Sequence, residues 1–301
     1  MSFFYYIHGL YFESDIKIYE LDDLPIIKRQ KPDVKILISD HFIDPLINKP
    51  INTTLFSEKR VFIKMDFGYF LIENGQFIFC SPSSKASNTL ISSFIIGWFM
   101  ALLFQQRNRL GFHCSALSFK SQAFLISGFS GAGKSTTSIS LIKQGCKYLS
   151  DDIAFTSADD GYLIYPSFPL QKVCKNELIR VGSPQKLIPI DEKKDKFALI
   201  DKDNFDGLPQ KISSFFLLEV CDSQKLEYAS VLGFDKVPIL LNSLFLMPFF
   251  RDFGYPISIK FECLKLASSI QVIRIKRPKD IDTTDKVCNI IQHYLEEPCQ
   301  L

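Results

Sequence analysis

The first 85 residues alternate between short apolar runs and turn residues, which is the pattern of a β-rich region. Apolar runs at 34–38, 60–64, 67–72 and 76–80 have the length of strands. An Asn-Gly step separates the last two runs, and both of its residues tolerate the positive φ that a tight hairpin turn needs. The polar segment 81–87 that follows lacks periodicity. We therefore predict a small β-rich N-terminal domain over residues 1–86.

The most apolar stretch of the chain, residues 90–104, predicts a helix. Spanning the hydrocarbon of a membrane needs about 20 largely apolar residues. This run is shorter, contains two serines and a glycine, and ends in two glutamines and an arginine. We therefore favour a buried interior helix over a membrane span. Ser87 or Asn88 is placed to cap the start of this helix.

Beyond residue 110, strands alternate with short helical segments, which favours an α/β layer architecture over residues 87–301. The charged stretch 190–203 is typical of a solvated loop, with a mobile lid over a site as the alternative. Apolar residues recur near helical spacing from 280 to 297 and predict a closing amphipathic helix. The expected strands lie at 112–119, 123–127, 148–150, 162–165 and 215–220.

Charge and cysteine content narrow the classes of function. The 301 residues carry 35 Lys+Arg against 33 Asp+Glu, so the formal net charge is only +2. Because a protein that coats a polyanion needs a clustered basic excess, we expect no nucleic-acid partner. The N-terminus lacks the basic and apolar regions of a secretion signal, and the eight cysteines are scattered without a C-x-x-C pair. We therefore expect reduced thiols and a cytoplasmic location.

One segment matches the pattern G-x-x-x-x-G-K-[ST] without a mismatch. The glycines of such a loop let backbone N–H groups converge on a phosphate at the start of a helix. The expected nucleotide-binding residues are Gly128, Phe129, Ser130, Gly131, Ala132, Gly133, Lys134, Ser135 and Thr136. Lys134 would reach the outer phosphates of ATP, and the Ser135 hydroxyl would help to hold Mg²⁺.

Two adjacent carboxylates follow the next short apolar run. Asp151 and Asp152 come just after residues 146–149, at the C-terminal end of an expected strand, where open α/β sheets place their ligands. One carboxylate can hold a metal ion, and the other can accept a proton from an attacking hydroxyl. A solvated turn is the alternative, and the phosphate-binding loop just upstream makes it the weaker one.

These segments together resemble the HPr kinase/phosphorylase family of serine kinases. His113 lies 134 − 113 = 21 residues before Lys134, and Asp152 lies 152 − 134 = 18 residues after it, spacings that agree with the family. The resemblance implies a P-loop kinase core of the type shared with phosphoenolpyruvate carboxykinase. It also implies that Asp152 is the general base toward the acceptor hydroxyl, that His113 lies beside the reacting phosphate, and that Asp151 assists with the metal.

The acidic-Arg-Gly-Leu-Gly signature of that family is missing from residues 160–230. In this respect the chain is more similar to HPr kinase-like proteins that phosphorylate lasso peptide precursors. That resemblance implies an ATP- and Mg²⁺-dependent transfer to a serine or threonine hydroxyl of a peptide or small protein. A free-serine kinase and a nucleotide-binding regulatory module with little catalysis stay open as alternatives, as does a homo-oligomer. Lys172 and Arg277 are further candidate phosphate or substrate contacts.

Overall fold

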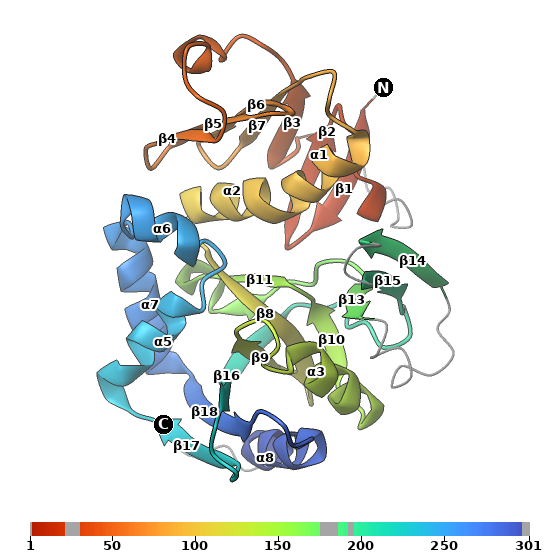
Figure 1. Cartoon of the computed structure of the whole chain (residues 1–301), viewed down its shortest axis with the longest axis vertical. Coiled ribbons are helices and arrows are strands. Elements are labelled where there is room, and N and C mark those ends of the chain that lie inside the picture. Colours follow the sequence, from red (N-terminus) through yellow and green to blue (C-terminus); the bar gives the residue numbers. More distant parts are fainter. Residues whose placement is uncertain (1, 22–30, 175–185, 192–195, 297–301) are drawn as a thin grey trace. The chain divides into compact units, whose positions relative to one another are not determined.

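The structure is a computed structural model that describes residues 2–21, 31–174, 186–191 and 196–296. Within these residues the chain is a mixed α/β protein, which confirms the predicted class (Figure 1). It divides into two compact units. One unit is Met1–Gly111 with Leu246–Ile259, and the other is Phe112–Phe245 with Lys260–Leu301. The chain therefore passes from one unit to the other three times.

The first unit is built on a sheet with the strand order β1-β2-β3-β7-β6-β5-β4. The predicted hairpin is confirmed, because β6 pairs antiparallel with β7 and the turn residues Asn74 and Gly75 have φ values of 56° and 64°. Two 3-10 turns, Tyr19–Leu21 and Asp44–Leu46, interrupt the connections. The strands are β1 (Phe3–Ile7), β2 (Leu10–Ser14), β3 (Val34–Ile38), β4 (Thr53–Phe56), β5 (Arg60–Met65), β6 (Gly68–Glu73) and β7 (Phe77–Pro82).

The apolar stretch forms a continuous helix made of α1 (Asn88–Phe94), a π-helical turn (Ile95–Phe99) and α2 (Met100–Gln106). Ser87 caps its start, because its hydroxyl accepts a hydrogen bond from the backbone N–H of Leu90 at 3.1 Å. By length and composition alone this helix could cross a membrane. In its most apolar 18-residue segment, however, 56% is buried inside the protein. The ring of Phe99 lies 4.7 Å from that of Phe70 on β6. The first unit therefore includes this helix, whereas the predicted boundary at residue 86 lies before it.

A second chain segment completes the first unit. Helix α6 (Met247–Phe253) brings two phenylalanines to the end of β4. The ring of Phe56 lies 5.2 Å from that of Phe249 and 5.5 Å from that of Phe253. Aromatic pairs at these separations stabilise a fold beyond the area that they bury. Residues far along the chain thus belong to the N-terminal unit, and the sequence patterns do not predict this.

The second unit contains a sheet with the order β10-β8-β9-β16-β18-β17, to which β11 and β12 add at β8 and β16. Its central strand β16 runs parallel to β9 and β18, and β8 runs antiparallel to β9 and β10. The C-terminal ends of β9, β10, β16 and β18 therefore lie at one edge of the sheet. The strands are β8 (Leu110–Phe119), β9 (Gln122–Gly128), β10 (Lys147–Ser150), β11 (Ile153–Thr156), β12 (Leu163–Ile164), β16 (Gln210–Cys221), β17 (Glu227–Val231) and β18 (Gln271–Pro278).

Helices α3 (Lys134–Lys143) and α8 (Thr284–Glu296) pack on this sheet. Leu141 of α3 and Ile291 of α8 join Ile126 and Phe216 of the sheet in one buried cluster. The predicted closing helix is confirmed in α8, and Gly145 follows the end of α3 with a φ of 97°. The remaining helical elements are the 3-10 turns Ala158–Asp160 and Gly233–Asp235 and the helices α5 (Lys236–Asn242) and α7 (Ile257–Ser269).

A small third sheet has the order β13-β15-β14 and consists of β13 (Leu170–Cys174), β14 (Lys186–Asp191) and β15 (Lys196–Ile200). The predicted loop at 190–203 is therefore wrong where β14 and β15 cover it, while residues 192–195 lie outside the described part of the chain. Phe197 and Leu199 alternate along β15 and pack with Val173 against Ile139 of α3. The apolar run at 197–200 is only four residues long and has charged residues on both sides, so periodicity alone does not identify it as a strand.

Candidate functional site

The glycine-rich loop joins β9 to α3, and its backbone has the conformation that glycine permits. Gly128, Gly131 and Gly133 have φ values of 152°, 83° and 97°. A Cβ atom at Gly128 would overlap the carbonyl oxygen of Leu218 on β16. A Cβ atom at Gly133 would lie 3.3 Å from Nε of Arg277. Two reasons thus favour glycine in the motif. A side chain would meet neighbouring atoms at Gly128 and Gly133, and the positive φ values of all three residues are ones that glycine adopts most easily.

Two basic side chains bond to the carbonyl oxygens of this loop. Lys134 Nζ donates to the carbonyl of Gly128 at 2.7 Å. Arg277, near the end of β18, donates from Nε to Ala132 O at 2.7 Å and from Nη2 to Gly131 O at 2.9 Å. The C=O and N–H groups of a trans peptide point in opposite directions, so the N–H of Gly133 is turned away from Arg277. Arg277 thereby fixes the orientation of a loop peptide, a contact that differs from the direct phosphate contact expected of it.

A second cluster forms where β10 ends. Asp152, in the left-handed region with a φ of 72°, places Oδ2 2.7 Å from Lys172 Nζ and Oδ1 3.4 Å from His113 Nδ1. The neighbouring Asp151 accepts hydrogen bonds from the Ser115 hydroxyl at 3.3 Å and from the backbone N–H of Lys172 at 2.7 Å. Two carboxylates, one histidine and one lysine are thus brought together from three separate strands or turns.

The two carboxyl groups have opposite pKa shifts. Burial raises the pKa of Asp151, and the negative charge of Asp152 raises it further. Burial also acts to raise the pKa of Asp152, but the hydrogen bond from His113 and the ammonium group of Lys172 outweigh it, and the pKa falls well below its usual range. Adjacent titratable groups whose pKa values are pushed apart are typical of sites that divide acid and base roles.

Strand β8 lies between the loop and the carboxylates. Cys114 of β8 is paired with Ser127 at the end of β9, and the Ser127 hydroxyl donates to the carbonyl of His113 at 2.9 Å. Burial raises the pKa of the Cys114 thiol, which also feels the charges of Lys134, Asp151 and Asp152. The loop lysine and the carboxylate pair therefore follow β9 and β10, the two strands that flank β8 in the same sheet.

The remaining loop residues differ in exposure. Phe129 is 76% exposed, and Ser130 is also exposed, whereas Ala132 is buried. Ser135 and Thr136 are half-buried in the first turn of α3. The tip of the expected nucleotide-binding loop thus presents an aromatic ring to solvent.

The residues present fit the groups that the motif implies. The loop supplies glycines, a lysine and a helix start, which suit the phosphates of a nucleotide. In the part of the chain that the structure describes, no three His, Cys, Asp or Glu side chains gather as a metal site. Mg²⁺ commonly binds through one or two protein oxygens together with waters and substrate phosphates. The hydroxyl of Ser135 and the carboxylate of Asp151 are oxygen donors of that kind.

Sequence reasoning did not select Ser115, although a signal for it was present. Side chains two residues apart on a strand lie on the same face, and Ser115 is two residues after His113. Its contact with Asp151 follows from that placement.

Comparisons with known proteins give little beyond this geometry. No family model and no curated protein matches the chain. Among the solved structures with similarity is the Hpr(Ser) kinase/phosphatase from Coxiella burnetii, which is 13% identical. The match covers 62% of this chain and 91% of that chain, with a TM-score of 0.31. That TM-score is too low to establish a shared fold.

Proposed function

We propose that the protein is a phosphotransferase that moves the γ-phosphoryl group of ATP, with Mg²⁺, to a serine or threonine hydroxyl. The observation that supports this is the position of two clusters at the ends of β9 and β10, the two strands that flank β8: the glycine loop with Lys134, and the carboxylate pair Asp151 and Asp152. A glycine loop by itself is consistent with nucleotide binding alone. A carboxylate pair beside it adds a base for an acceptor, and transfer to a hydroxyl needs both.

In this proposal the phosphates bind to the backbone N–H groups of the loop and to Lys134. The ammonium of Lys134 now bonds to the Gly128 carbonyl, so it is already held over the loop. Ser135 and Asp151 would hold Mg²⁺, which neutralises charge on the phosphates during transfer. The raised pKa of Asp151 is consistent with this role. Burial and the neighbouring charge of Asp152 disfavour the ionised form of Asp151, and a bound cation would stabilise that form.

Asp152 is proposed as the base. The acceptor hydroxyl loses its proton to a carboxylate oxygen of Asp152, a bond forms between that hydroxyl oxygen and the γ-phosphorus, and the bond to the ADP oxygen breaks. The low pKa of Asp152 keeps it ionised but makes it a weak base. Lys172 is one cause of that low pKa. If the Lys172 side chain moved from Asp152 to the bound phosphate, the pKa of Asp152 would rise and the carboxylate would become a stronger base.

We propose a serine of a peptide or small protein as the acceptor, as in the kinases of lasso peptide precursors. The exposed ring of Phe129 at the loop tip supports this choice, because a large exposed aromatic side chain is suited to contact with another chain. Free serine offers little surface for that contact. A free amino acid as acceptor would therefore make less use of the exposed ring of Phe129.

The test is transfer from γ-labelled ATP, with Mg²⁺, to free serine, HPr and serine-containing peptides. We expect a peptide to be labelled by the wild type and not by Asp152→Asn, while both bind ATP. Asp159→Asn is the matched control, because Asp159 is an exposed acid in a 3-10 turn of the same unit. If ATP binds but no acceptor is labelled above Asp152→Asn, the chain is a nucleotide-binding module and the kinase proposal is wrong.

A further inference from the structure

Strand β17 forms one margin of the sheet of the second unit (Figure 1). It pairs with β18, and no other backbone hydrogen bond joins residues 227–231 to the part of the chain that the structure describes. The strand at the other margin, β10, differs. Its Tyr148 donates a backbone hydrogen bond to Asn204 at 2.9 Å and accepts one from Asp206 at 2.8 Å. The side of β17 that faces away from β18 is therefore a free edge, and such edges can pair with another chain.

The features that usually prevent such pairing are missing from β17. Native sheets protect their margins with lysine, proline or a β-bulge. The sequence of β17, Glu-Tyr-Ala-Ser-Val, has neither lysine nor proline, and its five residues pair with β18 in unbroken register. Large apolar side chains are also exposed there, since Tyr228 is 52% exposed and Leu232, just after the strand, is 76% exposed. The free edge is thus both unprotected and apolar.

The strand is complementary to a second copy of itself. When two identical strands pair antiparallel across a two-fold axis, opposite residues share a face, so each register is centred on one residue. The register centred on Ala229 pairs all five residues of β17. It places Glu227 opposite Val231 and Tyr228 opposite Ser230. The two Glu227 residues then lie about 14 Å apart along the strands, which exceeds the screening length of about 8 Å. No like charges therefore oppose this pairing.

The same register brings exposed apolar side chains together. Leu232 has extended backbone angles, so it continues the strand by one residue and lies opposite Leu226 of the second copy. Leu226 packs against the buried cluster between the sheet and α8. Tyr228 and Ser230 share that face, because the Tyr228 ring lies 6.4 Å from that of Tyr294 on α8 and the Ser230 hydroxyl lies 3.2 Å from the Tyr294 hydroxyl. Pairing would therefore cover Leu232 with a leucine at both ends of the contact.

We propose that two copies of this chain associate through β17, which joins their sheets into one continuous sheet with Ala229 on the two-fold axis. A contact of one short strand from each copy is small for an interface, so the dimer should dissociate on dilution through about 1–100 µM. This association does not depend on the proposed function.

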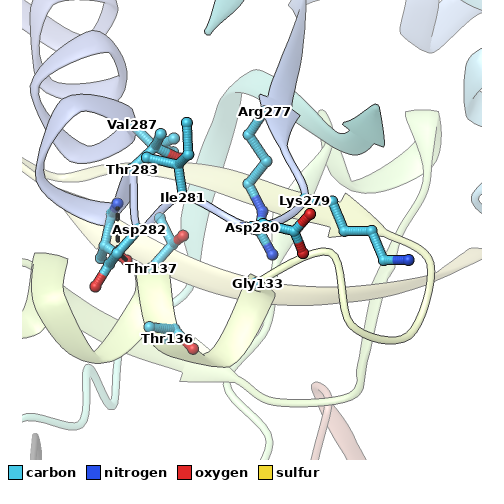
Figure 2. Close-up of a pocket in the computed structure, with 11 residues that line it drawn as sticks. Gly133, Thr136, Thr137, Arg277, Lys279, Asp280, Ile281, Asp282, Thr283 and Val287 are labelled. Carbon is cyan, nitrogen blue, oxygen red and sulfur yellow. Dashed lines mark hydrogen bonds between the residues drawn. The ribbon is translucent and has the colours of Figure 1, made fainter. Parts of the chain in front are cut away.

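The two nucleotide-binding loops stay apart in such a dimer. Glu227, at the start of β17, is paired with Lys276 near the end of β18. The next residue, Arg277, lies beside Gly133 of the glycine loop (Figure 2). Because antiparallel pairing reverses the direction of the second copy, its loop lies at the opposite end of the joined strands. Each copy therefore keeps its own site, and neither site contributes a residue to the other.

Analytical ultracentrifugation of the full chain tests the association. We expect a monomer–dimer equilibrium for the wild type. Ala229→Lys would place two ammonium groups opposite each other on the axis, so the dissociation constant should rise about five- to tenfold. Ser268→Lys is the matched control, because it adds the same charge at an exposed position on α7 and should dimerise like the wild type. A chain that is monomeric at every concentration, or a dimer that Ala229→Lys leaves equally stable, would overturn the proposal.

Cysteine cross-linking tests the register and does not depend on the folding of Ala229→Lys. Cβ atoms of opposite residues in an antiparallel pair are about 4.5–5.5 Å apart, close to the separation in a disulfide. Under mild oxidation Ala229→Cys should form a covalent dimer, whereas Glu227→Cys should do so only when mixed with Val231→Cys. The wild type under the same conditions is the control for the native cysteines. If Ala229→Cys forms no covalent dimer, or no more than Glu227→Cys alone, the β17 pairing is wrong.

Discussion

The three loop glycines give a graded prediction for replacement by alanine. At Gly128 the new Cβ would overlap the Leu218 carbonyl and lie 2.9 Å from Cβ of Ala132, with φ at 152°. We expect a cost of about 1–3 kcal/mol for the backbone conformation and about 1–3 kcal/mol more for overpacking. At Gly131, where φ is 83° and nothing lies within 4 Å, only the backbone contributes, about 1–2 kcal/mol.

Gly133→Ala should fall between these two variants. Its φ is 97°, and the new Cβ would lie 3.3 Å from Nε of Arg277, a side chain that can shift but would lose its bonds to the loop. We therefore expect a cost of about 1–3 kcal/mol in stability and a larger relative loss in nucleotide affinity.

Guanidinium unfolding followed by circular dichroism measures these free energies, and calorimetry measures ATP affinity alongside. Gly207→Ala is the control, because Gly207 has no positive φ and no atom within 4 Å of its added Cβ, so its stability should change little. A Gly128→Ala variant as stable as Gly131→Ala would refute the reasoning. It would mean that β16 can move away from the loop at little cost.

Three further predictions follow from the site and the core. Lys172→Met should raise the pKa of Asp152, measured by carbon NMR titration of its carboxyl group. Folding lowers that pKa, so ionised Asp152 stabilises the fold at pH values above its unfolded pKa of about 4, and this stabilisation is lost as the pH falls further. The variant should therefore lose less stability in acid than the wild type. An unchanged pKa of Asp152 in the variant would contradict the role of Lys172. Arg277→Lys, which cannot donate the same fork, should weaken ATP binding about five- to tenfold, and equal affinity would contradict a role in shaping the loop. Burial raises the pKa of Cys80 and Cys263 to about 12, so both should resist iodoacetamide at pH 8 until the protein unfolds, as mass spectrometry would show.

Local features of this fold could be predicted because their cause is local. The Asn74-Gly75 hairpin needs two residues that tolerate positive φ, and the Ser87 cap needs a hydroxyl before an apolar helix. The glycine loop is likewise a contiguous pattern between a strand and a helix. In each case a few neighbouring residues carry both the signal and the interaction.

Contacts between distant residues had no such signal. Lys172 on β13 reaches Asp152 although β11 and β12 lie between them in the sequence, and Arg277 reaches Gly131 because β18 lies beyond β16 in the sheet. These contacts depend on strand order and register, which composition and periodicity do not determine. The resemblance suggested both basic residues as contacts but not their partners.

The aromatic contact of Phe56 with Phe249 and Phe253 has a consequence for synthesis of the chain. The strands of the first unit leave the ribosome early, but the rings that cover the end of β4 are made about 200 residues later. At about 5–20 residues per second this is a delay of about 10–40 s. During that interval Phe56 would be exposed on an unfinished sheet, so the first unit completes its fold only after most of the second has been synthesised.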